Sequence, residues 1–322
     1  MSAISNLKIK LGNKDKMRKL MFGSREKNGV LLNVVVYTLL ISIGFVFLYP
    51  ILHMFTISVM TPADLLDSSV RWVPRSIHFT NYHLAWLTLD YLSTLWKNVQ
   101  IALFPTVLQV VSTAMAGYAF ARYNFPLKKL WLAALIFTFV IPPQITMVPT
   151  FVLYTELGLT GSLFAFTVPA LLGQGFNSAI FILIFYNFHK QVPVSLIEAA
   201  EIDGAGHVSS FFRISMPLAV PAIIVTTLFS FVWYWNETFL VNLFLGFGNT
   251  REDGLTTLLL ELTRFTQSYG GALEAAGMPP DPLNEGIRMA GTMLSIVPLG
   301  LLYLILQKHF VESVDKAGIT GE

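Results

Sequence analysis

The stretch Glu198-Ala199-Ala200-Glu201-Ile202-Asp203-Gly204-Ala205-Gly206 lies between two long apolar runs of the chain. The second of these runs opens with Ile214-Ser215-Met216-Pro217. Irregular backbone is avoided in hydrocarbon, so a polar, turn-forming segment between two apolar runs belongs at a membrane surface. This stretch therefore predicts a loop that joins two membrane-spanning helices.

The composition indicates a membrane protein. Hydrophobic residues make up 54% of the chain and charged residues 12%, and the mean hydropathy is +0.62. In a soluble domain, about a quarter of the residues are charged. The absence of cysteine excludes a disulfide framework and a thiolate metal site. The net charge of +2 is too small to indicate nucleic acid as a partner.

Six runs lack Asp, Glu, Lys and Arg for long enough to cross a bilayer, which takes ~20 residues. They predict an all-α polytopic membrane protein with six transmembrane helices. The runs are Val30–Ala63, with its helix ending near Phe55, and Asn98–Ala121, Leu130–Tyr154, Ser162–Phe188, Ile214–Asn236 and Met289–Gln307.

The distribution of basic residues sets the orientation of these spans. Most of the 21 Lys and Arg residues lie in the first 29 residues and in the loops on the same side. Such residues concentrate on the cytoplasmic side, so we expect both termini and the loop at 189–217 to be cytoplasmic. The predicted domains are a basic segment at 1–29, a transmembrane domain at 30–310 with external loops at 56–97 and 246–286, and a tail at 311–322. The basic segment either binds anionic lipid or serves only as an anchor.

The polar stretch resembles the coupling loop of ATP-binding-cassette (ABC) import permeases. That pattern is Glu-Ala-Ala, then Asp-Gly-Ala, then Ile-x-Leu-Pro, and here Met216 stands in the place of Leu. Further matching stretches favour the carbohydrate branch of the family, similar to the smaller permease of a maltose-type pair. They are Gly117–Arg122, Ile141-Pro142, Met147–Pro149, Trp233–Glu237 and Leu306–Val311.

The resemblance implies a type I importer permease in the bacterial cytoplasmic (inner) membrane. It implies a second, different permease subunit, two ATPase subunits that bind ATP and Mg, and an extracytoplasmic solute-binding protein. This chain would bind no cofactor and would import a sugar. The residues implied to couple it to the ATPase are Glu198, Ala199, Ala200, Asp203, Gly204, Ala205 and Pro217.

The residues of this loop also predict its local structure. We expect a short helix from Val194 to Ile202, with Pro193 fixing the first turn and Ser195 helping to cap it. Gly204 permits the left-handed backbone that ends a helix. A second helix from His207 would carry Phe211 and Phe212 as apolar knobs, and Pro217 would mark re-entry into the fifth span.

Polar and aromatic side chains within or at the ends of spans are candidates for a sugar path. Amides and carboxylates can bind sugar hydroxyls, and flat rings can pack on their C–H faces. The candidates are Gln144, Gln174, Asn177, Tyr234, Trp235, Asn236 and Glu237, with Gln109 and Trp233 as further ones. The alternatives are that the aromatic residues are membrane-interface anchors and that Gln109 only holds helices together. Pro142-Pro143 and Gly173–Gly175 predict breaks in spans three and four that serve either a cavity or packing.

Four other functions compete with this interpretation. The chain has no G-x-x-x-x-G-K-[ST] phosphate loop, so we do not expect it to hydrolyse ATP or to be an enzyme. A secondary transporter usually has ionisable groups inside its spans, and here only Glu237, at an outer edge, qualifies. A permease of the same type for a non-sugar solute and a membrane scaffold remain as alternatives.

Overall fold

The computed structural model describes residues 23–24, 27–246 and 254–319. The remainder of the basic segment, residues 247–253 of the second external loop and the last three residues of the tail lie outside the described residues. The chain divides into two compact units, Met1–Phe79 and Thr80–Glu322. The regular elements of the described residues are helices, apart from one two-residue antiparallel pair, β1 (Gly23–Ser24) with β2 (Lys27–Asn28).

The first unit is built on one long apolar helix, α2 (Val30–Ser58). Its 29 residues rise roughly 43 Å, which is more than the ~30 Å hydrocarbon core needs. The helix ends about one turn beyond the predicted Phe55. The short helix α3 (Pro62–Leu66) follows, and the Thr61 side chain caps it by accepting a hydrogen bond from the Asp64 N–H.

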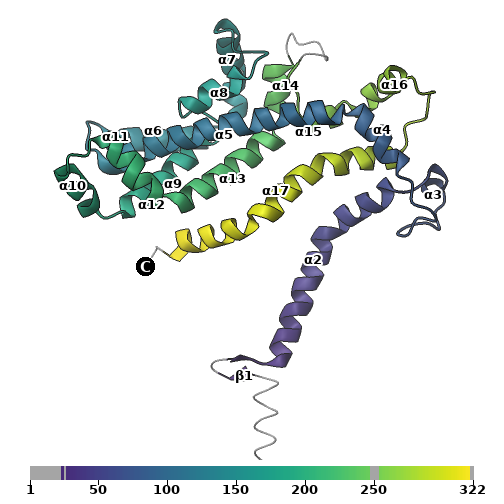
Figure 1. Ribbon diagram of the computed structural model, residues 1–322, viewed down its shortest axis with the longest axis horizontal. Helices are drawn as coiled ribbons and strands as arrows, with labels where there is room; N and C mark the ends of the chain where they lie inside the picture. The colour runs from purple at the N-terminus through teal and green to yellow at the C-terminus, as the bar shows by residue number, and fades with distance from the viewer. Residues whose placement is uncertain (1–22, 25–26, 247–253, 320–322) are drawn as a thin grey trace, which may run out of the picture. The chain divides into compact units, whose positions relative to one another are not determined.

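The second unit is a bundle of helices centred on α5 (Tyr91–Arg122), with α9 (Ser178–Gln191), α13 (Val220–Asn236) and α8 (Phe164–Leu171) packed against it (Figure 1). Gly117 permits the closest approach of α5 to α9, because an added Cβ would lie 2.5 Å from Phe185 Cβ. The other elements are α4 (Thr80–Thr88), α6 (Lys128–Val140), α7 (Pro143–Glu156), α10 (Val194–Ile202), α11 (His207–Ser210), the π-helical turn η1 (Phe211–Ser215), α12 (Met216–Leu218), α14 (Phe239–Leu245), α15 (Leu258–Thr263), α16 (Phe265–Ala275) and α17 (Glu285–Ile319).

Three described helices are long and apolar enough to cross a membrane by themselves, namely α2, α5 and residues 285–308 of α17. Three bent helix pairs raise the number of candidate spans to as many as six. The predicted break in span three is confirmed, since α6 and α7 meet at 99° around Pro142. The fifth run is also broken, with a bend of 81° between α12 and α13, where Pro217 and Pro221 supply no backbone N–H.

The predicted break in span four separates α8 from α9. The 14 residues of α9 rise roughly 21 Å, which is too short for the hydrocarbon core. If this run crosses the bilayer, the non-helical residues 172–177 must lie within the hydrocarbon and need internal hydrogen-bond partners.

The described part of the predicted second external loop is folded. Its helices α15 and α16 bury Leu258, Phe265 and Tyr269 in the main apolar core of the second unit. The N-terminus of α15 is fixed to α5, because the Leu258 N–H donates to Asn98 Oδ1 at 2.8 Å. This loop is therefore a structured cap on the helices rather than a bare connector.

Candidate functional site

The predicted coupling helix has the expected bounds, because α10 runs from Val194 to Ile202. Pro193 precedes its first residue, with φ −57° at the N-cap. The predicted cap from Ser195 is wrong, since no side chain caps this helix. The second predicted helix, α11, begins at His207 as expected. In Figure 1, α10 and α11 lie together beyond the ends of α9 and α12.

The end of α10 is a Schellman turn, the C-terminal arrangement in which two N–H groups fold back onto the last carbonyls. Gly204 has φ +85°, its N–H donates to Glu201 O at 3.0 Å, and the Ala205 N–H donates to Ala200 O at 2.8 Å. An added Cβ at Gly204 would meet nothing within 4 Å. Glycine is therefore favoured there by the backbone conformation, not by lack of space.

One face of the coupling loop is bare and partly apolar. Glu198, Ala199 and Asp203 are exposed, as a docking role requires. Ile202 is 86% exposed and Val208 is 71% exposed. These two apolar side chains make the exposed face of the loop a candidate docking surface. Sequence reasoning missed both, although Ile202 lies within the quoted stretch and Val208 lies just after it.

The two predicted aromatic knobs have different surroundings. Phe212 is 50% exposed, but Phe211 is 4% exposed and packs with Tyr118 and His189 at the root of the loop. The prediction for Phe211 is therefore wrong, because the π-helical turn rotates its ring into the bundle. Pro217 is exposed and lies in α12, just before the bend into the fifth span.

Several backbone groups of the break between α8 and α9 have hydrogen-bond partners within the bundle. The N–H groups of residues 172–174 donate to carbonyls of α8, and the Phe176 N–H donates to Tyr234 Oη at 3.3 Å. The Phe176 carbonyl accepts from Gln109 Nε2 at 2.6 Å. Ser112 Oγ caps the end of α8 by donating to Ala170 O at 2.6 Å.

Gln109 is the centre of this arrangement. Its side chain is fully buried, Nε2 also donates to Ser178 Oγ at 2.8 Å, and Oε1 accepts from Ser230 Oγ at 2.7 Å. One amide thus joins α5, α9 and α13. Of the two alternatives for Gln109, the geometry supports helix packing. Gly175 lets the backbone of the break approach the side chains of Gln109 and Tyr234. A Cβ added at Gly175 would lie 2.5 Å from Tyr234 Oη.

The candidate path residues fall into three groups. Tyr234 and Trp235 are 1% and 4% exposed, and the Tyr234 ring stacks on Phe176 at 4.5 Å, so both belong to the packed core. Glu237 is half-buried and accepts a hydrogen bond from the Leu240 N–H at 2.9 Å, at the start of α14. The amide residues are exposed, namely Gln144, Gln174, Asn177 and Asn236.

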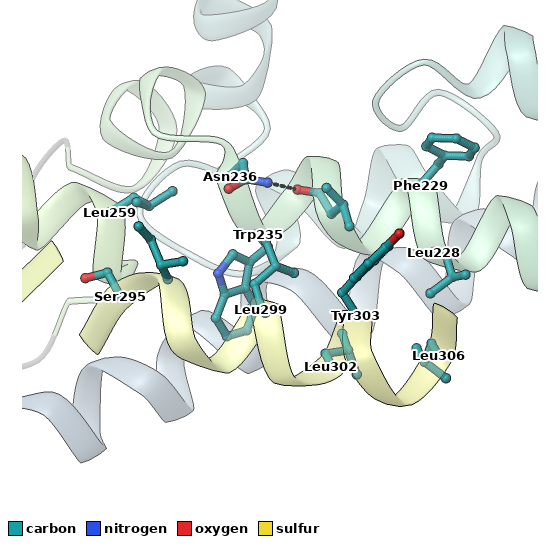
Figure 2. Close-up of a pocket in the computed structure, with 13 residues that line it drawn as sticks. Leu228, Phe229, Trp235, Asn236, Leu259, Ser295, Leu299, Leu302, Tyr303 and Leu306 are labelled. Atoms are coloured by element: carbon teal, nitrogen blue, oxygen red, sulfur yellow. Dashed lines mark hydrogen bonds between the residues drawn. The ribbon is translucent and has the colours of Figure 1, made fainter. Parts of the chain in front are cut away.

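Two cavities of about 510 Å³ each border two of these amides, Gln174 and Asn236. One lies between α5, α6 and the break in span four, with Gln174, Ser112 and Thr138 among its polar lining residues. The other lies between α13 and α17 and is apolar, with the rings of Trp235 and Tyr303 in its wall (Figure 2). Asn236 lies at its margin and donates from Nδ2 to Val232 O at 2.9 Å. The first cavity is the more polar of the two.

Comparisons with known proteins identify the family. Residues 110–316 match the model of the binding-protein-dependent transport system inner membrane component. The polygalacturonan/rhamnogalacturonan transport system permease protein YtcP of Bacillus subtilis is 25% identical over 90% of this chain and 99% of its own length. The arabinooligosaccharides transport system permease protein AraQ of Halalkalibacterium halodurans is 26% identical over 88% and 96%, respectively. The trehalose transport system permease protein SugB of Mycobacterium tuberculosis is 26% identical over 85% and 93%.

A solved structure has the same fold. A chain in the crystal structure of a bacterial ABC transporter involved in the import of the acidic polysaccharide alginate has a TM-score of 0.69. It is 24% identical, and the match covers 89% of this chain and 98% of that one. The family match covers most of the chain and confirms the resemblance that the coupling pattern indicated. This chain therefore belongs to the family of binding-protein-dependent ABC importer permeases and is a multi-pass inner-membrane transport component, not an enzyme.

Proposed function

We propose that this chain forms half of the translocation pore of an ATP-driven sugar or oligosaccharide importer. In this proposal it receives force from a separate ATPase through the loop Glu198–Gly206. The observation that carries the proposal is the short, Schellman-ended helix α10, which exposes Glu198, Ala199 and Ile202. A stiff helix with a bare apolar side chain is suited to docking in a partner's cleft.

The proposed cycle follows from this arrangement. Two ATPase subunits, which hold ATP and Mg, would dock on the coupling loops of this chain and of a second, different permease subunit. Their closure would swing α10 and convert the pore from inward-facing to outward-facing. An extracytoplasmic binding protein would deliver the sugar at the opposite side. This scheme requires the six-span topology with both termini in the cytoplasm.

The proposed sugar path uses the exposed amides rather than the buried rings. Gln144, Gln174 and Asn177 lie at or beside the breaks of spans three and four. Their side chains can donate to and accept from hydroxyl groups. Tyr234, Trp235 and Glu237 would support this path from behind, since they belong to the core and to the start of α14.

The named relatives favour an oligosaccharide as the solute. Their names include polygalacturonan/rhamnogalacturonan, arabinooligosaccharides and trehalose. A non-sugar solute is the second candidate, because a 28% identical relative from Synechocystis is named as an uptake permease for osmoprotective compounds. Uptake of labelled neutral oligosaccharides, acidic oligosaccharides and small osmolytes by the reconstituted importer would separate these solutes.

Site-directed crosslinking tests the coupling proposal. The chain contains no cysteine, so one introduced thiol is unique within it. Ile202→Cys, treated with a thiol-to-amine crosslinker, should link to the ATPase subunit. Leu66→Cys is the matched control, because Leu66 is 90% exposed but lies in the predicted external loop. Equal labelling from both positions, or none from Ile202→Cys, would contradict the proposal.

A further inference from the structure

The coupling loop leaves and re-enters the bundle at two roots, the end of α9 and the turn η1. A hydrogen bond joins these roots directly: His189 Nδ1 and Ser215 Oγ lie 2.8 Å apart, although 26 positions separate them in sequence. Both side chains are fully buried. Within the described residues, this is the one side-chain hydrogen bond between α9 and η1.

His189 occupies an aromatic cage. Its ring stacks on Phe185 at 6.0 Å and meets the edge of Tyr118 at 5.3 Å, with Phe211 at 6.3 Å on the η1 side. Its Nε2 is buried and has no hydrogen-bond partner among the described residues. An apolar ring would fill the same cage without leaving a buried polar atom unpaired. Packing within the cage therefore does not explain why position 189 is a histidine. The hydrogen bond to Ser215 does explain it.

The α9 root is fixed to the bundle in two further ways. Arg122, at the end of α5, donates from Nη2 to Val192 O at 2.6 Å, just before α10. Gly117 brings α5 into close contact with the backbone of α9. The η1 root is a π-helical turn, a form of helix that is rare and often marks functional sites. Its side-chain bond to the fixed root is the one from Ser215.

We propose that His189 and Ser215 are a positioning pair that locks the two roots of the coupling loop together, so that α10 and α11 move as one lever. This inference rests on the proposed function. With the lock closed, a displacement of α10 is transmitted both to α9 and, through η1 and α12, to the fifth span α13. Without the His189–Ser215 hydrogen bond, η1 can move independently of α9, and only part of the displacement of α10 reaches the fifth span.

The test compares solute imported per ATP hydrolysed by the complete importer in proteoliposomes. The variants are His189→Phe, which keeps a ring in the cage, Ser215→Ala, and the two combined. Each single variant should lower the transported-to-hydrolysed ratio about 2- to 10-fold, the factor that corresponds to one hydrogen bond. The double variant should be no worse than either single variant, since all three lack the same bond. Co-purification of the ATPase subunits should stay unchanged, and the melting temperature should fall by no more than the loss of one buried hydrogen bond causes.

A rescue variant separates positioning from packing. His189→Asn keeps a polar atom near the place of Nδ1 but loses most of the ring, so it should recover the ratio better than His189→Phe does. Hydrogen exchange supplies a second readout, and the amides of residues 207–218 should exchange faster in Ser215→Ala than in the unaltered complex.

The lock is refuted if Ser215→Ala retains the unaltered ratio, or if the two single effects multiply in the double variant. Failure of the proposed function would have a different signature. In that case the unaltered complex itself would show no ATP-driven uptake, whatever stands at positions 189 and 215.

Discussion

Replacing Gln109 with leucine removes the amide that fixes the break in the fourth span. Leucine fills a similar volume, so the change is mainly one of polarity. Ser230 Oγ still lies 3.2 Å from Thr106 Oγ1 and keeps a partner. The Phe176 carbonyl loses the bond from Gln109 Nε2, and this group lies in the segment that must stay dry if the run crosses the bilayer.

The magnitude follows from these lost contacts. Side-chain hydrogen bonds between membrane helices average about 0.6 kcal/mol, because the unfolded chain also finds partners. A buried carbonyl without a partner costs about 1–3 kcal/mol. The carbonyl therefore dominates, and we expect Gln109→Leu to lower the free energy of unfolding by about 2–3 kcal/mol. Unfolding of the purified chain by a denaturing detergent, followed by circular dichroism, measures this difference.

Gln174→Leu is the matched control, because Gln174 is an exposed amide in the same break. Its side chain makes no hydrogen bond within the described residues. We expect Gln174→Leu to change stability by less than about 0.5 kcal/mol and to lower uptake instead. Equal stability of Gln109→Leu and the unaltered chain, or equal loss in both variants, would refute the reasoning.

Three further predictions concern backbone and charge. Gly175→Ala should lower stability by about 1–3 kcal/mol in the same assay, because its Cβ would lie 2.5 Å from Tyr234 Oη, whereas Gly270→Ala, with open space around it, should not. Gly204→Val, at φ +85°, should abolish uptake and weaken ATPase binding on pull-down while membrane insertion persists, and full uptake would contradict the coupling role. Bonds from the Ser69 hydroxyl and N–H, together with Arg75, lower the pKa of Asp67 to about 2. The ionised Asp67 carboxylate therefore stabilises the turn fully above pH 3.8, and this stabilisation is lost as the pH falls toward 2. Hydrogen exchange of the Ser69 amide, corrected for the intrinsic rate, should change only below about pH 4. In Asp67→Asn it should not change with pH at all.

The sequence predicted features that depend on local chemistry. Pro193 and Gly204 bound the coupling helix through their own dihedral preferences, and the helix has the predicted ends. Pro142 and Pro143 supply no N–H and break span three for the same local reason. These effects act over a few residues and can be recognised in a single chain.

Features that depend on packing between distant segments were not predicted. Phe211 was predicted to be an exposed apolar side chain, because the residues next to it in the sequence do not indicate a π-helical turn. Tyr234 looked like a path residue, yet its ring packs on Phe176, more than 50 positions earlier in the chain. Gln109 was left between two roles because its partners belong to α9 and α13, which only the fold brings to it.

We propose that this chain works with a separate ATPase to import a sugar. The most direct test of this proposal is ATP hydrolysis by the complex co-purified through a tag on this chain, in lipid nanodiscs with the binding protein and a panel of neutral and acidic oligosaccharides. We expect hydrolysis that one class of sugar stimulates and that Gly204→Val uncouples or abolishes. A well-folded preparation that carries no ATPase activity, with or without any sugar, would contradict it.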